Sequence, residues 1–366
     1  MSMAYVSLMK ATVFKLYVAG ERLEDCRKVA SKTERFGMKI IVDHSTEEKE
    51  TPDAWASNLT AKDRLFKSIA KVLGTSTVGF VPIKITALAS PHLLEKMTAS
   101  ITSKADWEHS QVDPLPSLSP DEKDLADAAL HNLNAICEMA KDAGISVLLD
   151  AEQSNRQPAI EYLANRVMAQ HNTCAGSPPV VYNTFQMYLK GSIDRLRRDV
   201  RRANDNGYHL AVKLVRGAYM VTESARAEKL GIEDPVMPSK ESTDQQYNDA
   251  IQFLLEQKSQ GFGISTIIAT HNRQSILYAI EQMDALGIAK DDPSINFAQI
   301  LGLCDNLGHA LGDAGYNANK LVLFGDFEEV FPWLLRRLDE NQDALGATVA
   351  EADLLMSEIR RRCFGS

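Results

Sequence analysis

Charged and polar side chains interrupt or end a series of apolar, β-branched segments of this sequence. They are Lys84, Asp150, Glu152, Gln186, Lys213, Arg216, Thr270, His271, Asn272 and Gln299. A polar group inside a buried strand costs free energy unless it is paired, so its recurrence near the same end of successive segments indicates a shared site. Positive groups outnumber negative ones in this set, which suits an anionic ligand. Each residue taken alone is equally well explained by an internal ion pair, a strand end in water or a helix cap.

The segment KLVRGAYM (213–220) is the most informative of these. Alternation along a strand places Lys213 on one face, and Leu214 and Arg216 on the other. Gly217 then allows the backbone to turn closely around another group, because glycine has no Cβ. A strand that ends in Arg-Gly-Ala-Tyr is suited to hold a phosphate or a planar ring.

A second basic feature is the pair Arg336 and Arg337 in the segment WLLRRLDEN (333–341). In a helix, adjacent side chains diverge by about 100° around the axis, so the two guanidinium groups cannot share one partner. Either one of them extends to solvent, or two different anionic groups lie above the helix. Guanidinium groups match carboxylate oxygens in a bidentate geometry and stay charged at any relevant pH.

Eight strand-like segments, most of them nearly continuous in apolar residues, alternate with amphipathic helical patterns, as expected for strands buried on both faces. The segments are 38–43, 80–88, 145–152, 179–186, 209–219, 264–272, 295–302 and 320–325. Two of the helical patterns are 158–172 and 242–261, and the second begins with a Ser/Thr cap and ends on Gly. About eight β–α units predict an α/β fold of the (βα)8 barrel type, with its chemistry at the C-terminal strand ends. A doubly wound open sheet is less favoured, because no Gly-rich dinucleotide motif follows a strand.

Length and composition predict one barrel domain over residues 1–366, with the polar, Pro- and Ser-rich stretch 102–124 as a surface insertion. The hydrophobic content of 45% and the charged content of 24% are those of a globular protein with a large core. A net charge of −9 argues against nucleic acid as a partner. The basic run RLRRDVRR (195–202) is interpreted as a solvated helix face.

The cysteines and the first residues of the sequence indicate the kind of cellular compartment. Five scattered cysteines without a C-x-x-C spacing suit a reducing compartment and predict neither a disulfide framework nor a metal site. No window of about 18 unbroken apolar residues is present, so no transmembrane helix is expected. The first residues lack the pattern of a transit peptide and are interpreted as the start of a folded helix.

The motifs KITAL, LLDAE, NTFQMYLK, KLVRGAYM, ATHN, QILGLCD, DAGY and LLRRLDEN occur in the order found in the proline dehydrogenase family. The resemblance covers about residues 10–362 and is closer to the monofunctional eukaryotic type, hydroxyproline dehydrogenases included, than to the bifunctional bacterial proteins. It implies a distorted (βα)8 barrel with non-covalent FAD at the strand C-terminal ends and the last helix over the mouth. The implied activity is oxidation of L-proline to Δ1-pyrroline-5-carboxylate by hydride transfer to FAD N5.

The resemblance also implies roles for residues that face the substrate. Arg336 and Arg337 resemble the clamp on the substrate carboxylate, and Glu47, or Glu48 one residue on, resembles an acid that pairs with Arg336. Catalytic positions are implied for Lys84 and Asp150, a charged pair lining the substrate site, and for Lys213 near flavin N5, where many relatives have Arg. Further residues that contact the substrate would be Leu214, Tyr219, Leu321 and Trp333.

The remaining implied positions hold the cofactor. Arg216, Gly217, Ala218 and Tyr219 resemble the FAD cradle. Ser239, Lys240 and Thr243 occur where relatives touch the pyrophosphate and adenosine. Further cofactor contacts are implied for Gln186, Lys213, Thr270, His271, Asn272 and Gln299, and for Glu340, which would also brace one of the arginines.

The sequence departs from the family pattern at two places that line the substrate site. Leu321 stands where proline oxidisers carry Tyr in a YxPxG segment, and where hydroxyproline dehydrogenases carry Ser; Leu323 replaces the Pro. Trp333 stands where the family has a second Tyr. A wider, apolar site should tolerate ring-substituted or larger cyclic amino acids, but it offers 4-hydroxyproline no hydrogen bond, so proline is the favoured substrate. Hydroxyproline or another cyclic imino acid is the alternative substrate.

The resemblance further implies a quinone as electron acceptor, peripheral membrane contact and a location on the matrix side of the mitochondrial inner membrane. Two other classes of protein are compatible with the residues. One is a catalytically degenerate barrel that binds FAD or an imino acid as a sensor. The other is an aldolase- or epimerase-type barrel that uses Lys84 or Lys213 as a Schiff base.

Overall fold

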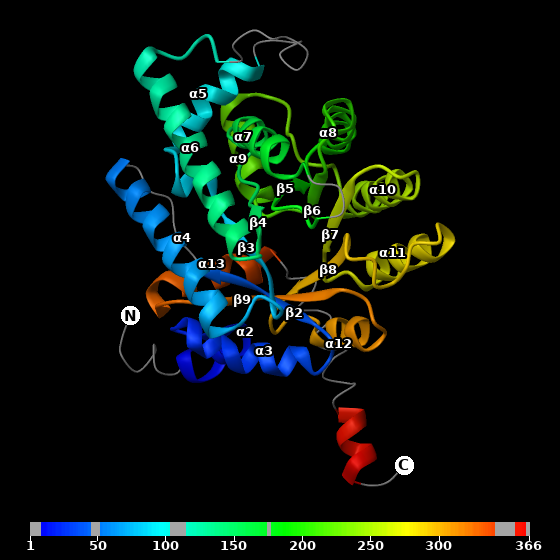
Figure 1. The fold of residues 1–366 in the computed structure, drawn as a ribbon. Coiled ribbons are helices and arrows are strands. Elements are labelled where there is room, and N and C mark those ends of the chain that lie inside the picture. Colours follow the sequence, from blue (N-terminus) through cyan, green and yellow to red (C-terminus); the bar gives the residue numbers. More distant parts are fainter. Residues whose placement is uncertain (1–8, 45–51, 103–114, 174–176, 341–355, 364–366) are drawn as a thin grey trace.

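The fold is a closed parallel barrel surrounded by helices (Figure 1). The computed structural model describes residues 9–44, 52–102, 115–173, 177–340 and 356–363. Within these ranges the barrel strands are β2 (Lys39–His44), β3 (Val78–Ile83), β4 (Ser146–Leu149), β5 (Val181–Gln186), β6 (Leu210–Val215), β7 (Ile264–Ala269), β8 (Ile295–Ile300) and β9 (Ala318–Phe324). Each pairs in parallel with the next along the chain, and β9 pairs with β2, which closes the barrel. The predicted (βα)8 barrel is therefore confirmed, and the open sheet is excluded.

All eight strand-like segments of the sequence contain a strand, but several strands end earlier than the apolar pattern suggested. β3 ends at Ile83, and the next residues form the 3-10 turn η3 (Ile85–Ala87) instead of continuing the strand. β4 ends at Leu149 and β6 at Val215, so Asp150 and Arg216 follow their strands. The polar residues that end the apolar segments therefore lie on the connections that leave the C-terminal end of the barrel.

The helices pack on the outside of the strands (Figure 1). They are α3 (Cys26–Glu34), α4 (Pro52–Val72), α5 (Pro91–Thr102), α6 (Pro120–Asp142), α7 (Gln157–His171), α8 (Ser192–Asn206), α9 (Met220–Leu230), α10 (Lys240–Ser259), α11 (Arg273–Ala285) and α12 (Asp305–Asp313). α13 (Phe327–Glu340) instead packs at the end of β9. A further helix covers residues 356–363. The expected helices 158–172 and 242–261 correspond to α7 and α10. No helix in the described ranges has the length and apolarity that a membrane span requires.

The stretch 102–124 is only partly the surface insertion that its composition suggested. Residues 103–114 lie outside the described ranges. Leu115 and Leu118 are buried in the core, and Ser119 caps α6 through a reciprocal pair of hydrogen bonds with Glu122. A Ser-Pro start followed by an acidic first turn is a strong helix-start signal, so the last residues of the stretch belong to a helix.

The N-terminal segment packs against α13. It comprises η1 (Lys10–Phe14), α2 (Lys15–Tyr17), β1 (Val18–Gly20) and η2 (Leu23–Asp25). β1 pairs with β9 at Leu323 and Phe324, beyond the point where β8 has ended. Phe14 and Val18 join one apolar cluster with Phe327, Val330, Phe331 and Leu334 of α13. The segment therefore fixes α13 to the end of β9.

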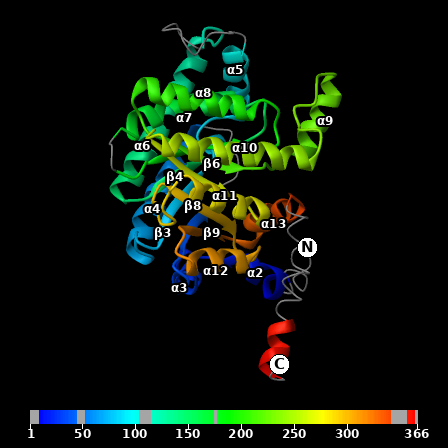
Figure 2. The same ribbon diagram turned by 90° about the vertical axis from the view of Figure 1, so that its right-hand side faces the viewer.

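The barrel interior is filled by one apolar layer below its mouth. The layer consists of Ile41, Phe80, Leu148, Tyr182, Ala211, Ile267 and Ala298. Leu321 belongs both to the edge of this layer and to the cluster under α13. α13, the helix that contains the arginine pair, therefore lies over the mouth, as expected, and Figure 2 shows it at the same end of the barrel as α9. A strand residue two positions beyond a member of this layer, toward the C-terminal end of the strand, also points into the barrel and faces the mouth.

Candidate functional site

Five charged side chains gather at the mouth, and they are here named the mouth cluster: Asp43, Lys62, Lys84, Asp150 and Lys213. Lys213 follows the inward-facing Ala211 by two positions, so it too points into the barrel. Its Nζ lies 2.7 Å from Asp150 Oδ1. Lys84 was expected as the partner of Asp150, but among the described residues Lys213 forms that ion pair. Lys84 is half-buried and acts electrostatically on Asp43 and Glu152.

Two members of the mouth cluster, Asp43 and Lys62, were not among the expected site residues. Asp43 alternates with the inward-facing Ile41 on β2, and Lys62 comes from α4. Burial and, to a smaller extent, the nearby Asp150 raise the pKa of Asp43 to about 6 against the opposing effect of the lysines of the cluster. Asp43 ends an apolar segment just as Asp150 does, so the same strand-end signal identifies it. Lys62 carries no such signal because it lies on a helix.

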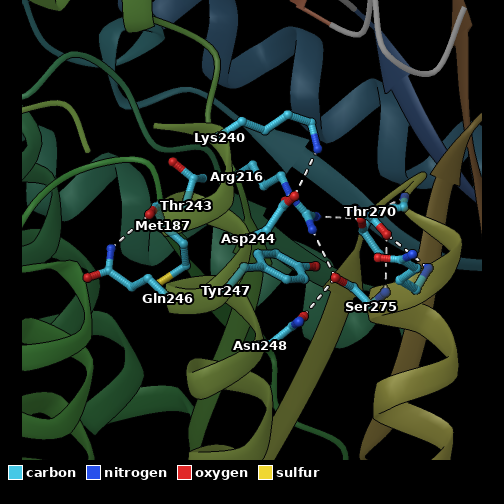
Figure 3. A network of polar contacts seen from close by, with 12 residues as sticks. Met187, Arg216, Lys240, Thr243, Asp244, Gln246, Tyr247, Asn248, Thr270 and Ser275 are labelled. Atoms are coloured by element: carbon cyan, nitrogen blue, oxygen red, sulfur yellow. Dashed lines mark hydrogen bonds and ion pairs between the residues drawn. The ribbon is translucent and has the colours of Figure 1, made fainter. Parts of the chain in front are cut away.

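Beside the mouth cluster, Arg216 is held by every polar edge of its guanidinium group (Figure 3). Nε lies 2.6 Å from Asp244 Oδ1, Nη1 donates to Thr270 Oγ1 at 2.6 Å and Nη2 to Ser275 Oγ at 2.9 Å. The group also lies 4.3 Å from the centre of the Tyr247 ring. These contacts join the end of β6 to α10, to the end of β7 and to α11. An arginine held by three different acceptors and stacked on an aromatic ring is rigid.

The N-terminus of α10 adds a second cation to the same place. Ser239 caps the helix, and Thr243, buried in its first turn, donates to the Ser239 carbonyl at 3.2 Å. Lys240 Nζ lies 2.8 Å from Asp244 Oδ2, so one carboxylate serves two cations. A helix N-terminus with surplus positive charge favours an anion. We refer to Arg216, Lys240, Asp244, Thr270 and Ser275 as the anion cradle.

The residues after β7 are fixed by backbone hydrogen bonds. Thr270 Oγ1 accepts the Asn272 N–H at 3.0 Å, and Asn272 caps α11 through its side-chain oxygen. His271 Nε2 accepts the Ile300 N–H at 3.0 Å. A nitrogen that accepts a backbone N–H carries no proton, so His271 is a neutral imidazole with its proton on Nδ1. Thr270 therefore belongs to the anion cradle, and the other two expected cofactor contacts, His271 and Asn272, follow it directly in the chain.

At Gly217, directly after Arg216, the backbone passes very close to the side chain of Tyr188. The Gly217 φ of +138° is a conformation that residues with a Cβ rarely adopt. A Cβ built there would fall against the ring carbons of the buried Tyr188. Ala218 and Tyr219 lead into α9, with Tyr219 at its N-cap position. On β5, Gln186 faces the mouth side and donates to the Glu152 carbonyl at 2.8 Å.

Two expected residues are not brought to the mouth. Leu214 is fully buried in the apolar core between the strands and the outer helices, together with Tyr247 and Ile268. Gln299 follows the inward-facing Ala298, so its side chain turns outward beneath α12, where its amide lies next to Gly308. Because neighbouring strand positions face opposite sides, Lys213 and Leu214 cannot both face the interior.

The arginine pair of α13 and the residues expected near it are described only in part. Arg337 is half-buried one turn after the buried Leu334, so it extends from the face of α13 that packs on the barrel. Leu321 is partly buried beneath α13. The side chains of Trp333, Arg336 and Glu340 and the whole of Glu47 and Glu48 lie outside the described part of the structure.

A barrel with charged residues at its mouth and an anion cradle beside them has the architecture of a (βα)8 enzyme that acts on a small charged substrate. The family model described as proline dehydrogenase matches residues 26–349, and the chain belongs to the proline dehydrogenase family of oxidoreductases. It is 32% identical over 381 residues to the hydroxyproline dehydrogenase of Bos taurus, covering 98% of this chain and 82% of that protein. It is also 32% identical over 379 residues to proline dehydrogenase 1, mitochondrial, of Arabidopsis thaliana, covering 98% and 75%.

A solved structure has the same fold. Proline utilization A (PutA) from Bdellovibrio bacteriovorus superposes with a TM-score of 0.76 at 20% identity, over 92% of this chain. The chain spans about a third of that longer protein, 33% of its length. The likeness extends to the closed barrel and its helices.

Proposed function

We propose that this protein is an FAD-dependent dehydrogenase that oxidises L-proline to Δ1-pyrroline-5-carboxylate. The observation that carries the proposal is the position of Lys213, inside the barrel mouth and paired with Asp150, next to the anion cradle. A cation inside the mouth suits a site where negative charge arrives on an acceptor. An anion cradle beside it suits the phosphates of a dinucleotide.

The residues of the site fit FAD. Arg216 and Lys240 share Asp244, so the cradle keeps a net positive charge for a pyrophosphate. Gly217 offers the close backbone approach that a flat ring or a phosphate requires. Arg216, Lys240, Thr243, Thr270 and Asn272 would hold the phosphates and the adenosine part, with Lys213 and Gln186 at the ring. When bound, FAD supplies a two-electron acceptor for hydride.

The chain's own residues bind and prepare the imino acid. Arg336 and Arg337 grip the carboxylate and thereby fix the ring's orientation. The secondary amine must be unprotonated when hydride leaves, because an ammonium has no electron pair to form the C=N bond. The lysines of the mouth cluster disfavour a second cation there and so lower the pKa of the amine. Lys213 favours negative charge on the acceptor.

Electrons would leave through a quinone at a membrane. The named relatives include proline dehydrogenases described as mitochondrial, which supports a mitochondrial location for this chain as well. The matrix side of the inner membrane, with peripheral contact to it, is the place that such an acceptor requires.

The proposal is tested by the visible absorption of the FAD-loaded protein under anaerobic conditions. We expect L-proline to bleach the flavin bands and the protein to reduce a dye acceptor in steady state. Protein mixed with buffer alone is the control. A yellow protein that no imino acid bleaches would indicate the sensor, and a borohydride-trapped adduct on Lys84 or Lys213 without any flavin would indicate the Schiff-base class.

Hydroxyproline is the second candidate substrate, because hydroxyproline and proline dehydrogenases resemble the chain equally well. Leu321 lies between the interior layer and α13, where its side chain would contact a substituent on the substrate ring. We expect Leu321→Ser to raise the ratio of kcat/KM for 4-hydroxyproline over L-proline by about tenfold, the value of one added hydrogen bond. Leu335→Ser, at an exposed position of α13, is the matched control. An unchanged ratio in Leu321→Ser would remove this residue from the substrate site.

A further inference from the structure

The buried face of α4 contains one charged side chain. Its other members are Trp55, Asn58, Leu65, Phe66 and Ile69, and Lys62 occupies the same face with 5% of its surface exposed. Asn58 Nδ2 donates to the Ala87 carbonyl at 3.0 Å, which ties this face to the turn that follows β3 at the mouth. Lys62 lies one helical turn further on. Placing an ammonium group on an apolar face is costly, so its charge needs a compensating role.

Asp43 is the acid nearest to this lysine in electrostatic terms. It points inward from β2 in register with Leu323, and 8% of its surface is exposed. Lys62, Lys84 and Lys213 all favour its ionised form, and Asp150 opposes it. Burial lowers the pKa of Lys62, whereas Asp43 and Asp150 counteract that shift. Asp43 on β2 and Lys62 on α4 are therefore close enough to interact electrostatically.

The other acids near the mouth are already engaged. Asp150 is paired with Lys213 at 2.7 Å. Glu152 accepts both the N–H and the hydroxyl of Thr86, at 3.2 and 3.0 Å, and lies 3.5 Å from Arg156. Within the described ranges, Asp43 forms no ion pair and no side-chain hydrogen bond, although it is more buried than Asp150. Its carboxylate is the one that remains available to take a proton from a ligand.

We propose that Asp43 accepts the proton that the substrate's secondary ammonium must lose before oxidation, and that Lys62 is the positioning residue that keeps Asp43 ionised. The step breaks one N–H bond, leaves its electron pair on nitrogen and forms one O–H bond on Asp43. The proton then passes from the Asp43 carboxyl to solvent before the next turnover. This inference rests on the proposed oxidation of an imino acid in the same site.

The test is the pH dependence of kcat/KM for L-proline, which reports groups of the free enzyme. Asp43, with a pKa of about 6, is ionised above that pH, so activity should rise as pH passes through this region. Lys62→Met removes a charge that favours the carboxylate, so the rising limb should move to higher pH by about one unit. Lys62→Arg keeps the charge and should restore the limb. Lys71→Met, exposed on the same helix, is the matched control.

Asp43→Asn provides an independent measurement. It should lower kcat/KM at neutral pH by about 100-fold, as expected for loss of a proton acceptor, while the flavin spectrum stays that of the wild type. Wild-type turnover by Asp43→Asn would overturn the inference, and so would a pH profile of Lys62→Met that coincides with that of Lys71→Met. If Lys62→Met does not fold, Asp43→Asn decides alone. A wild-type protein that oxidises no imino acid contradicts the proposed function instead.

Discussion

Replacing Arg336 and Arg337 together by methionine is expected to lower kcat/KM for L-proline by about 1,000-fold while the flavin spectrum is retained. Each charge-assisted hydrogen bond to a carboxylate contributes about 1.5–3 kcal/mol, and two are lost. Methionine keeps the helix propensity and much of the apolar volume of arginine, so α13 should stay in place. Steady-state kinetics with a dye acceptor measure the effect, most of which should appear in KM.

The packing of α13 makes this expectation specific to the two arginines. Phe327, Phe331 and Leu334 fix the helix to the end of β9 through apolar contacts. Arg337 follows Leu334 by three positions, so it extends near the face of α13 that packs on the barrel. The apolar contacts of α13 remain in the double variant, so a loss of activity would come from the missing guanidinium groups.

A matched control is available in the same chain. Arg360 and Arg361 also stand side by side, in the exposed helix 356–363. Arg360→Met together with Arg361→Met should leave kcat and KM unchanged. If the Arg336/Arg337 variant behaves in the same way, neither the carboxylate clamp nor the assignment of the substrate site survives.

The barrel was predictable because parallel strands covered on both faces leave a continuous apolar pattern. The strand ends were less so. Residues 84–88 continue the apolar run of β3, yet the chain turns into η3, because Thr86 bonds to the buried Glu152 of the next connection. That partner lies 66 positions away in the sequence, and local patterns carry no information about it.

The sequence predicted which kinds of residue form the site better than it predicted which of them pair with one another. Polar residues at strand ends correctly indicated where Lys213 and Asp150 meet. Neighbouring side chains of a strand point to opposite faces. Because Lys213 and Ala298 face the barrel interior, Leu214 and Gln299 must face away from it. Lys62 could not be predicted as a site residue, because a lysine on a helix is usually solvated. Its burial depends on how α4 packs against the barrel.

The Arg216 contacts show the same limit. Asp244 and Ser275 lie 28 and 59 positions from Arg216 in the sequence, on two different helices. Neither residue type stands out in an amphipathic helix. Their convergence depends on how α10 and α11 pack on β6 and β7, so the anion cradle could be located from KLVRGAYM but its members could not be named.

Gly217→Ala is expected to abolish flavin binding and to lower the free energy of unfolding by about 3–5 kcal/mol. The methyl group would overlap the ring of Tyr188, which is 1% exposed and has no space to withdraw. The backbone is additionally in a region, at a φ of +138°, that alanine adopts only with strain of about 1–3 kcal/mol. The flavin content of the purified protein and urea unfolding monitored by circular dichroism measure the two effects.

Gly231→Ala separates the overlap from the backbone strain. Gly231 also has a positive φ, +62°, at the C-terminal cap of α9, but no atom lies within 4 Å of a Cβ built there. Alanine at this position should therefore cost only about 1 kcal/mol and leave the flavin content unchanged. Because both glycines flank the same helix, a general weakening of α9 would affect both variants equally. Full flavin content and wild-type stability in Gly217→Ala would show that the backbone after β6 can move away from Tyr188, and the close approach assigned to this turn would then be wrong.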